Sequence, residues 1–261
     1  MENVYSAWIY FTPRFDIPLA VWGGIYLHKL VLGLLEKKQT FFNHYAQKPF
    51  MLSPIMKNSS CIGHGMLLKD DVYMFRITTL SQSVLRMLIE ALYQSSEIPI
   101  VPIRIESKIL KLEIPSTNRN SNKKLLIELK LRFYPTMFKF RGYTVLYPSP
   151  MRLLTSALRD LHMARKIDLR PILRKVFLNV ELISYNTKIQ KLYIGKDMNG
   201  RDRYLRAFQG EASFIIVAEG HKLPLLNMLL EITKHCGVGK NRSIGLGYVE
   251  VVKQSVIKSV K

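Results

Sequence analysis

The stretch from residue 237 to residue 247 combines residue types that bind phosphate groups. Glycine lets backbone N–H groups approach a polyanion closely, because it has no Cβ atom. Cationic side chains at the same place add attraction for negative charge. The pattern predicts a basic, glycine-rich loop that contacts a phosphodiester backbone. The candidate contact residues are Gly237, Gly239, Lys240, Arg242, Ser243, Gly245 and Gly247.

Two familiar phosphate-binding loops do not fit this stretch. A Walker A loop needs Ser or Thr after its Gly-Lys pair, but Asn241 stands there, and Lys234 takes the place of the first glycine. A dinucleotide-binding loop needs a third glycine where this chain has Arg242, and a strand before the loop rather than a helix. The remaining interpretation is contact with a nucleic-acid backbone.

The composition of the chain favours the same partner. Its 261 residues include 39 Lys and Arg against 19 Asp and Glu, a net charge of +20. Such an excess repels itself and is typical of a surface for nucleic acid or for an anionic membrane. A uniformly basic proteome is the alternative explanation. Hydrophobic residues make up 48% of the chain, enough for a substantial core in one large or two smaller domains.

Residues 17–35 form a long, mostly apolar run, which we interpret as a buried amphipathic helix rather than a membrane span. The run contains Pro18, three glycines and the pair His28-Lys29, and a spanning helix rarely keeps a charge at its midpoint. Asp16 before Pro18 is typical of an N-cap followed by a first-turn proline. Residues 1–15 lack the pattern of a secretory signal peptide. We therefore expect no membrane partner.

The sequence indicates neither a metal site nor a cofactor. Cys61 and Cys236 are isolated, form no CxxC pair and suggest no zinc site. The acidic residues are scattered and form no cluster with histidine. Unpaired cysteines are typical of a reducing compartment, so we expect a cytoplasmic protein.

The order of predicted elements repeats one plan twice. In the first half, strands and helices alternate as β-α-β-β-α-β, with a helix over residues 18–36 and another, capped by Ser81, that continues to residue 92. Its strands are predicted at residues 4–12, 48–56, 66–79 and 98–114. The polar segment 116–124 contains no apolar residue and is the best boundary.

The second half restarts with a strand at residues 125–133 and an amphipathic helix at 150–165. Strands follow at 176–185, at 191–194 and 204–208 (a hairpin turned by Asn199-Gly200 as a type I′ turn), at 213–218 and at 247–252. A helix over residues 223–235 has Pro224 in its first turn and Gly237 at its end. The sequence therefore predicts an α+β protein of two tandem ferredoxin-like (RRM-like) domains, residues 1–117 and 118–261.

Four segments, in this order along the chain, carry a resemblance to a known family: residues 48–54, KPFMLSP; 72–80, VYMFRITTL; 134–138 with 146–150, YPTMF and LYPSP; and 237–247, GVGKNRSIGLG. Together they resemble the CRISPR-associated endoribonucleases that trim precursor CRISPR RNA, members of the repeat-associated (RAMP) superfamily. The glycine-rich stretch alone would indicate only the superfamily.

The resemblance implies metal-independent cleavage of RNA. The ribose 2′-OH attacks the neighbouring phosphorus and leaves a 2′,3′-cyclic phosphate, or its hydrolysis product, and a 5′-OH. Such a reaction needs a base, an acid and a cation for the charge that develops on the phosphate. Imidazole suits the acid or base role because its unperturbed pKa lies near neutrality.

By this resemblance His44 and Lys48 match a catalytic His and Lys of several family members. Some relatives carry a tyrosine on the first helix where this chain has Leu32, which cannot transfer a proton. His28 lies one helical turn earlier on the same face and is the candidate substitute. Half-buried packing would account for either histidine without catalysis. Tyr26 and Tyr45 are further candidates.

The remaining histidines and four aromatic residues give weaker signals. His64 lies in a predicted turn and His162 on a helix surface, while His235 near a helix C-terminus is explained by the helix dipole. Tyr134, Phe138, Phe140 and Tyr143 suit either base stacking or core packing.

Two function classes remain after the resemblance. One is an endoribonuclease acting on CRISPR repeat RNA. The other is a non-catalytic RAMP subunit that holds guide RNA in a CRISPR effector complex. A membrane-surface protein is a third and weaker reading. The sequence leaves open the repeat that is recognised and whether the chain forms a homodimer.

Overall fold

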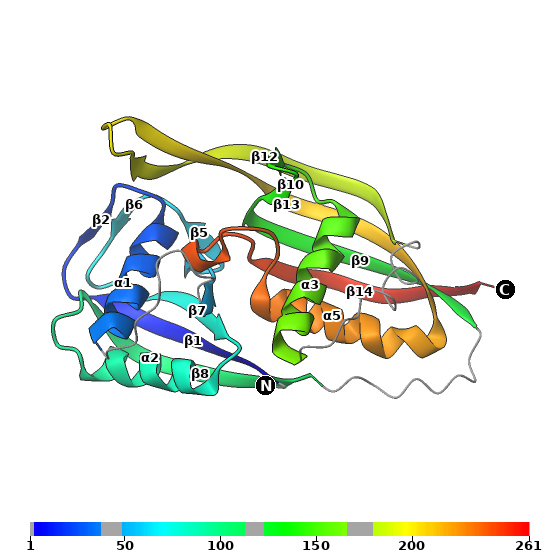
Figure 1. Ribbon diagram of the computed structural model, residues 1–261, viewed down its shortest axis with the longest axis horizontal. Coiled ribbons are helices and arrows are strands. Elements are labelled where there is room, and N and C mark those ends of the chain that lie inside the picture. Colours follow the sequence, from blue (N-terminus) through cyan, green and yellow to red (C-terminus); the bar gives the residue numbers. More distant parts are fainter. Residues whose placement is uncertain (1–2, 38–48, 113–122, 166–179, 261) are drawn as a thin grey trace.

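The computed structural model describes residues 3–37, 49–112, 123–165 and 180–260. Figure 1 shows two sheets side by side, the first coloured blue to green and the second green to red. We call the first sheet with α1 and α2 the first unit, and the second sheet with α3 and α5 the second unit. Each unit has the β-α-β-β-α-β order, which confirms the predicted fold class of two tandem ferredoxin-like units. The predicted boundary at 117/118 lies outside the described residues.

The first unit is a twisted antiparallel sheet with two helices packed on one face. The strands lie in the order β5-β4-β7-β1-β8, and β3 also pairs with β7. The central strand β1 buries alternate side chains against α1 and α2, as expected for a strand with one covered face. Its elements are β1 (Asn3–Pro13), β2 (Ile17–Leu19), α1 (Gly23–Lys37), β3 (Phe50–Leu52), β4 (Ile55–Lys57), β5 (Ser60–Ile62), β6 (Gly65–Leu67), β7 (Tyr73–Thr79), α2 (Gln82–Gln94) and β8 (Ile100–Lys111).

The second unit repeats this plan with longer strands. The strand order is β12-β13-β9-β14, and α3 and α5 pack on one face. A small hairpin, β10 with β11, follows β9. The elements are β9 (Lys124–Thr136), β10 (Phe138–Phe140), β11 (Tyr143–Val145), α3 (Pro150–Arg165), β12 (Val180–Lys196), β13 (Asp202–Glu219), η1 (Gly220–Lys222), α5 (Leu223–Cys236), η2 (Arg242–Ile244) and β14 (Val249–Val260).

The start predicted for the first helix is wrong. Residues 17–19 pair with β6 as strand β2, and α1 begins only at Gly23. Asp16 accepts a hydrogen bond from the Lys69 amide at 2.9 Å instead of capping a helix. The apolar character of residues 17–19 therefore belongs to a short strand. Among the described residues, no helix is long and apolar enough to cross a membrane.

The second unit contains one long hairpin where shorter strands were predicted. The segments 191–194, 204–208 and 213–218 are parts of β12 and β13, which pair from Val180↔Ile216 to Lys196↔Asp202. In the turn at 197–201, Gly200 is the only residue with positive φ, so the turn is not type I′, which needs two such residues. The hairpin extends over the first unit in Figure 1, and the Tyr193 carbonyl accepts from the Trp22 amide at 2.8 Å.

The two units share buried side chains. Val4 and Leu112 of the first unit pack with α3 and α5 of the second. Trp22 packs with Met137 and Leu246, and Met56 packs with Tyr134 and Tyr248. The glycine-rich loop joins α5 to β14. It lies at this contact between the two units.

Candidate active site and nucleic-acid interface

The glycines of the glycine-rich loop (residues 237–247) allow close contact with the protein's own backbone. A Cβ on Gly239 would lie 2.3 Å from the Met137 carbonyl oxygen, and one on Gly247 would lie 1.9 Å from that of Val238. Both residues also have left-handed φ angles, of 81° and 78°. The loop therefore packs tightly against itself and against Met137, the residue after β9.

All four loop glycines donate their amides inside the protein. The Gly237 amide donates to Thr233 O at 2.9 Å as the cap of α5, which confirms the predicted helix end. The Gly239 amide donates to Ser156 Oγ at 3.0 Å. The amides of Gly245 and Gly247 donate to backbone carbonyls at 3.2 and 2.8 Å. The glycine amides are therefore already used inside the protein. In this conformation they cannot make the phosphate contacts that the sequence predicted. The exposed Lys240 and the half-buried Ser243 are the candidate contacts that remain.

The Arg242 side chain lies inside the molecule rather than at an RNA-facing surface. Only 8% of it is exposed, and its guanidinium binds both carboxylate oxygens of Asp160 on α3, with Nη2 to Oδ1 at 2.8 Å. Nη1 also donates to the carbonyls of Cys236 and Gly237 at the end of α5. The predicted direct contact of Arg242 with phosphate is therefore corrected to a structural role: it fastens the loop to α3 and α5.

His28 contacts the other end of the same loop. Its Nδ1 lies 3.0 Å from the carbonyl oxygen of Ser243, and its ring centroid lies 5.7 Å from that of Phe50. A carbonyl oxygen can only accept, so Nδ1 carries the hydrogen in this contact. In the neutral ring, the proton-accepting nitrogen is then Nε2. The loop thus fixes the tautomer of His28 that suits a base at Nε2.

Helix α1 is held against the loop by Trp22, the residue before it, and by Gly24 in its first turn. Trp22 Nε1 donates to the Ile244 carbonyl at 2.7 Å. A Cβ on Gly24 would lie 1.8 Å from the same carbonyl oxygen, so only glycine permits this approach. These contacts determine where His28, one turn further along α1, meets Ser243.

The other predicted catalytic residues, His44 and Lys48, lie outside the described residues, as does Tyr45. Their roles stay predictions. Leu32 packs against the first core. Burial raises the pKa of Tyr26 to about 12, and its hydroxyl has no partner in the described part of the chain, which makes it a poor base.

His235 differs from its predicted role at a helix end. A helix dipole favours the charged form, yet burial, Arg76 and Lys108 lower the pKa of His235 to about 4. Its Nδ1 lies 3.0 Å from Ser6 Oγ across the contact between the units. His162 is exposed, as predicted. Within the described ranges, no group of three or more His, Cys, Asp or Glu side chains could hold a metal ion.

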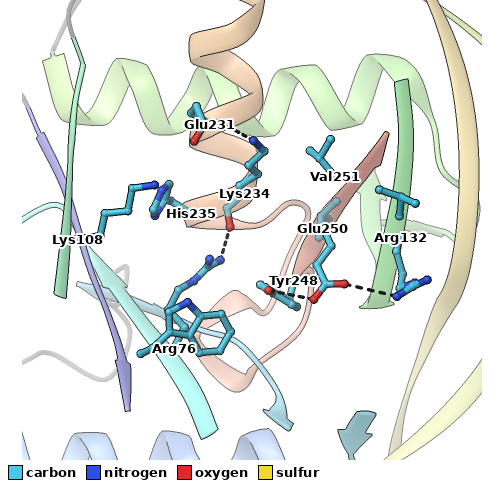
Figure 2. A pocket seen from close by; sticks show the side chains of 12 residues that line it. Arg76, Lys108, Arg132, Glu231, Lys234, His235, Tyr248, Glu250 and Val251 are labelled. Atoms are coloured by element: carbon cyan, nitrogen blue, oxygen red, sulfur yellow. Dashed lines mark hydrogen bonds and ion pairs between the residues drawn. The ribbon is translucent and has the colours of Figure 1, made fainter. Parts of the chain in front are cut away.

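A cavity of about 590 Å³ opens between the two units, on the side of β1, β7 and β14 (Figure 2). Four cations line it, Arg76, Lys108, Arg132 and Lys234, against the carboxylates of Glu231 and Glu250. Lys234 pairs with Glu231, and Arg132 pairs with Glu211 and Glu250. The lining is therefore net positive, which suits a polyanion.

Arg76 is the buried cation of this cavity. Its guanidinium lies 5.3 Å from the ring centroid of Trp8 and 4.9 Å from that of Tyr248, and it donates to the Lys234 carbonyl. This cavity was not predicted from the sequence, although one charged residue within the apolar strand 73–79 was a signal for it.

The comparisons with known proteins agree with this fold. Residues 131–249 match the family model of the CRISPR-associated endoribonuclease Cas6. A solved Cas6 product complex is 20% identical, with a TM-score of 0.69, over 97% of this chain and all of that chain. Thermus thermophilus Cas6 is 19% identical, with a TM-score of 0.64, over 97% of this chain and 99% of its own. No curated protein sequence matches the chain.

A Cas6-related protein from Pyrococcus furiosus is more distant, at 13% identity and a TM-score of 0.53 over 96% of this chain and 99% of its own. The match to the family model begins within β9 and includes the glycine-rich loop, whereas the structural matches extend through both units. Together, these matches confirm the resemblance that the sequence predicted, to the CRISPR Cas6-type processing family.

Proposed function

We propose that this protein is an endoribonuclease that cleaves precursor CRISPR RNA within its repeats. The family match, the fold of Cas6 product complexes and the net charge of +20 support an RNA substrate. The observation that carries the catalytic part is the contact between His28 and Ser243, because it holds the imidazole of helix α1, with Nε2 as its proton-accepting nitrogen, against a loop that also presents Lys240.

The proposed reaction is metal-independent transesterification. A base removes the proton of the 2′-OH, the oxygen forms a bond to phosphorus, and the bond from phosphorus to the 5′-oxygen breaks. An acid returns a proton to that oxygen, so the products are a 2′,3′-cyclic phosphate (or its hydrolysis product) and a 5′-OH. In this proposal His28 and His44 share the base and acid roles, and Lys48 stabilises the charge on the phosphate.

The test is cleavage of a repeat-spacer RNA by the purified protein in EDTA, followed by analysis of the product ends. Removal of a general acid or base costs about 10²- to 10⁴-fold in rate. His28→Ala and His44→Ala are each expected to lose cleavage on this scale while still binding RNA. His162→Ala, on the exposed face of α3, is the matched control. Full activity of a variant removes that histidine from the mechanism, and a strict requirement for Mg²⁺ overturns the mechanism itself.

The second candidate is a non-catalytic RAMP subunit that holds guide RNA in an effector complex. One similar structure, 16% identical with a TM-score of 0.51, is described as a RAMP protein that binds different RNA substrates. Such a subunit would bind repeat RNA tightly without cutting it. Cleavage by the purified chain alone therefore separates the two candidates, and sedimentation of the same sample tests whether the chain forms a homodimer.

A further inference from the structure

A second, smaller cavity lies on the outer side of the glycine-rich loop, against α3. Its volume is about 140 Å³, and we call it the α3 pocket. A cavity of about this size holds a benzene molecule, so a phosphate group fits within it. The lining residues that matter here are Lys139, Arg152, Ser156, Arg159, Gly239 and Lys240.

The lining of the α3 pocket carries four cations and no carboxylate. Asp160, the acidic neighbour of Arg159 on α3, is fully buried and binds Arg242 through both of its oxygens. The positive charge of Lys139, Arg152 and Lys240 is therefore not compensated within the pocket. An uncompensated cluster of this kind attracts an anion.

Arg159 supplies an unsatisfied donor to the same place. Its Nε is buried and has no hydrogen-bond partner in the described part of the chain. Within the described part of the chain, its Nη2 makes one long contact, with the Gly239 carbonyl at 3.4 Å. Burial and, to a lesser degree, the nearby charge of Arg242 lower the pKa of Arg159. A buried donor without an acceptor is costly, and an anionic oxygen would satisfy it.

Aromatic side chains stand at the rim, on the hairpin of β10 and β11. The guanidinium of Arg152 lies 4.5 Å from the ring centroid of Phe140 and donates to the Lys139 carbonyl at 3.1 Å. Phe140 is 51% exposed and Tyr143 is 78% exposed. Exposed rings beside cations are the arrangement in which proteins stack unpaired bases next to a bound backbone.

We propose that the α3 pocket binds a phosphodiester group of the RNA strand, through Arg152, Arg159 and Lys240. Phe140 stacks on a base beside that phosphate. Lys240 and Ser243 are three residues apart in one loop, so a strand held at Lys240 follows the loop toward His28. The residues themselves recognise a phosphate group beside an aromatic ring. That this phosphate belongs to RNA rests on the proposed function.

The experiment measures binding rather than cleavage. A fluorescent repeat RNA with a 2′-deoxy sugar at the mapped cleavage position binds without reacting, and its anisotropy is measured between about 50 and 200 mM salt. Arg152→Gln and Lys240→Gln are each expected to weaken binding about tenfold. Each should also reduce the slope of log affinity against log salt by about 0.7 to 0.9, the value of one lost phosphate contact. Phe140→Ala should weaken binding with the slope unchanged.

Arg86→Gln is the matched control, because it removes the same charge from an exposed position on α2. If the pocket variants and this control have equal affinity and slope, the α3 pocket does not bind RNA. If the wild-type protein itself does not bind the repeat RNA, the proposed function fails instead. Lys240 is exposed, so Lys240→Gln should have the melting temperature of the wild type. If Arg152→Gln proves unstable, Lys240→Gln alone still tests the pocket.

Discussion

The ion pair between Arg242 and Asp160 determines what the glycine-rich loop can do. Both side chains are removed from water, with 8% and 0% of their surface exposed. Two buried charges gain little net stability by pairing, but removal of one partner leaves the other without compensation. The pair therefore holds the glycine-rich loop against α3, and breaking it is costly. It does not supply binding energy for RNA.

Asp160→Asn is expected to lower the free energy of unfolding by about 3–5 kcal/mol, because Arg242 keeps its charge in the buried site. Chemical denaturation measures this loss. Glu90→Gln, which breaks the exposed pair of Glu90 with Arg86, is the matched control and should change stability by less than about 1 kcal/mol. Equal effects of the two substitutions would mean that the guanidinium of Arg242 finds other partners or water.

His235 makes the protein sensitive to acid. Its folded-state pKa of about 4 lies below the unperturbed value of about 6.5, so between these values the unfolded chain binds one more proton than the folded chain. Stability from this residue is complete above about pH 6.5 and decreases by about 1 kcal/mol per pH unit as the pH falls toward 4. His235→Gln should flatten the pH dependence of the unfolding free energy in this window, relative to wild type and to His162→Gln. An unchanged slope would show that His235 is protonated without loss of the fold.

At the scale of elements, the contact between α1 and the glycine-rich loop depends on one missing side chain. Gly24 and Gly33 lie on the same helix, but a Cβ at Gly24 would collide with the Ile244 carbonyl, and one at Gly33 would meet nothing within 4 Å. The same substitution therefore has opposite effects at the two positions.

Gly33→Ala is expected to stabilise the protein by roughly 1 kcal/mol, since alanine favours the helix. Gly24→Ala should destabilise it by about 1–3 kcal/mol through overpacking, and should lower RNA cleavage because His28 and Ser243 move apart. Thermal melts and cleavage rates of the pair measure both effects. A Gly24→Ala protein with wild-type stability and rate would show that the loop and α1 separate without consequence.

The sequence predicted correctly those helices whose ends are determined by neighbouring residues, such as a capping serine or a first-turn proline. Ser81 caps α2 through a hydrogen bond from the Val84 amide, and α3 spans Pro150–Arg165 as predicted. The start of α1 failed because residues 17–19 pair with β6, a partner almost fifty residues away that no local pattern reveals. The same limit applies to the site: His28 was identified by the family resemblance and by its spacing from Leu32, but its partner Ser243 lies 215 residues along the chain.

At the scale of the whole molecule, the end of α5 joins the two units. Four consecutive carbonyls at this end accept hydrogen bonds from side chains: Lys234 from Arg76, His235 from Thr78, and Cys236 and Gly237 from Arg242. The negative end of the helix dipole favours the two guanidinium groups. Arg76 and Thr78 belong to β7 of the first unit, so the helix end of the second unit is completed by the first. The two units should therefore unfold together.

Thr78→Val tests this coupling, because it keeps the shape of a buried side chain and removes its 2.7 Å hydrogen bond to the His235 carbonyl. The orphaned carbonyl should cost about 1–3 kcal/mol. Both tryptophans, Trp8 and Trp22, belong to the first unit and contact the second, so their fluorescence follows the first unit and its contact with the second, while far-UV circular dichroism follows the whole chain. In Thr78→Val both transitions should shift together to lower denaturant. Thr155→Val removes an exposed hydroxyl within α3 and should leave both in place. A fluorescence transition that shifts alone would mean that the first unit unfolds, or separates from the second, while the second stays folded.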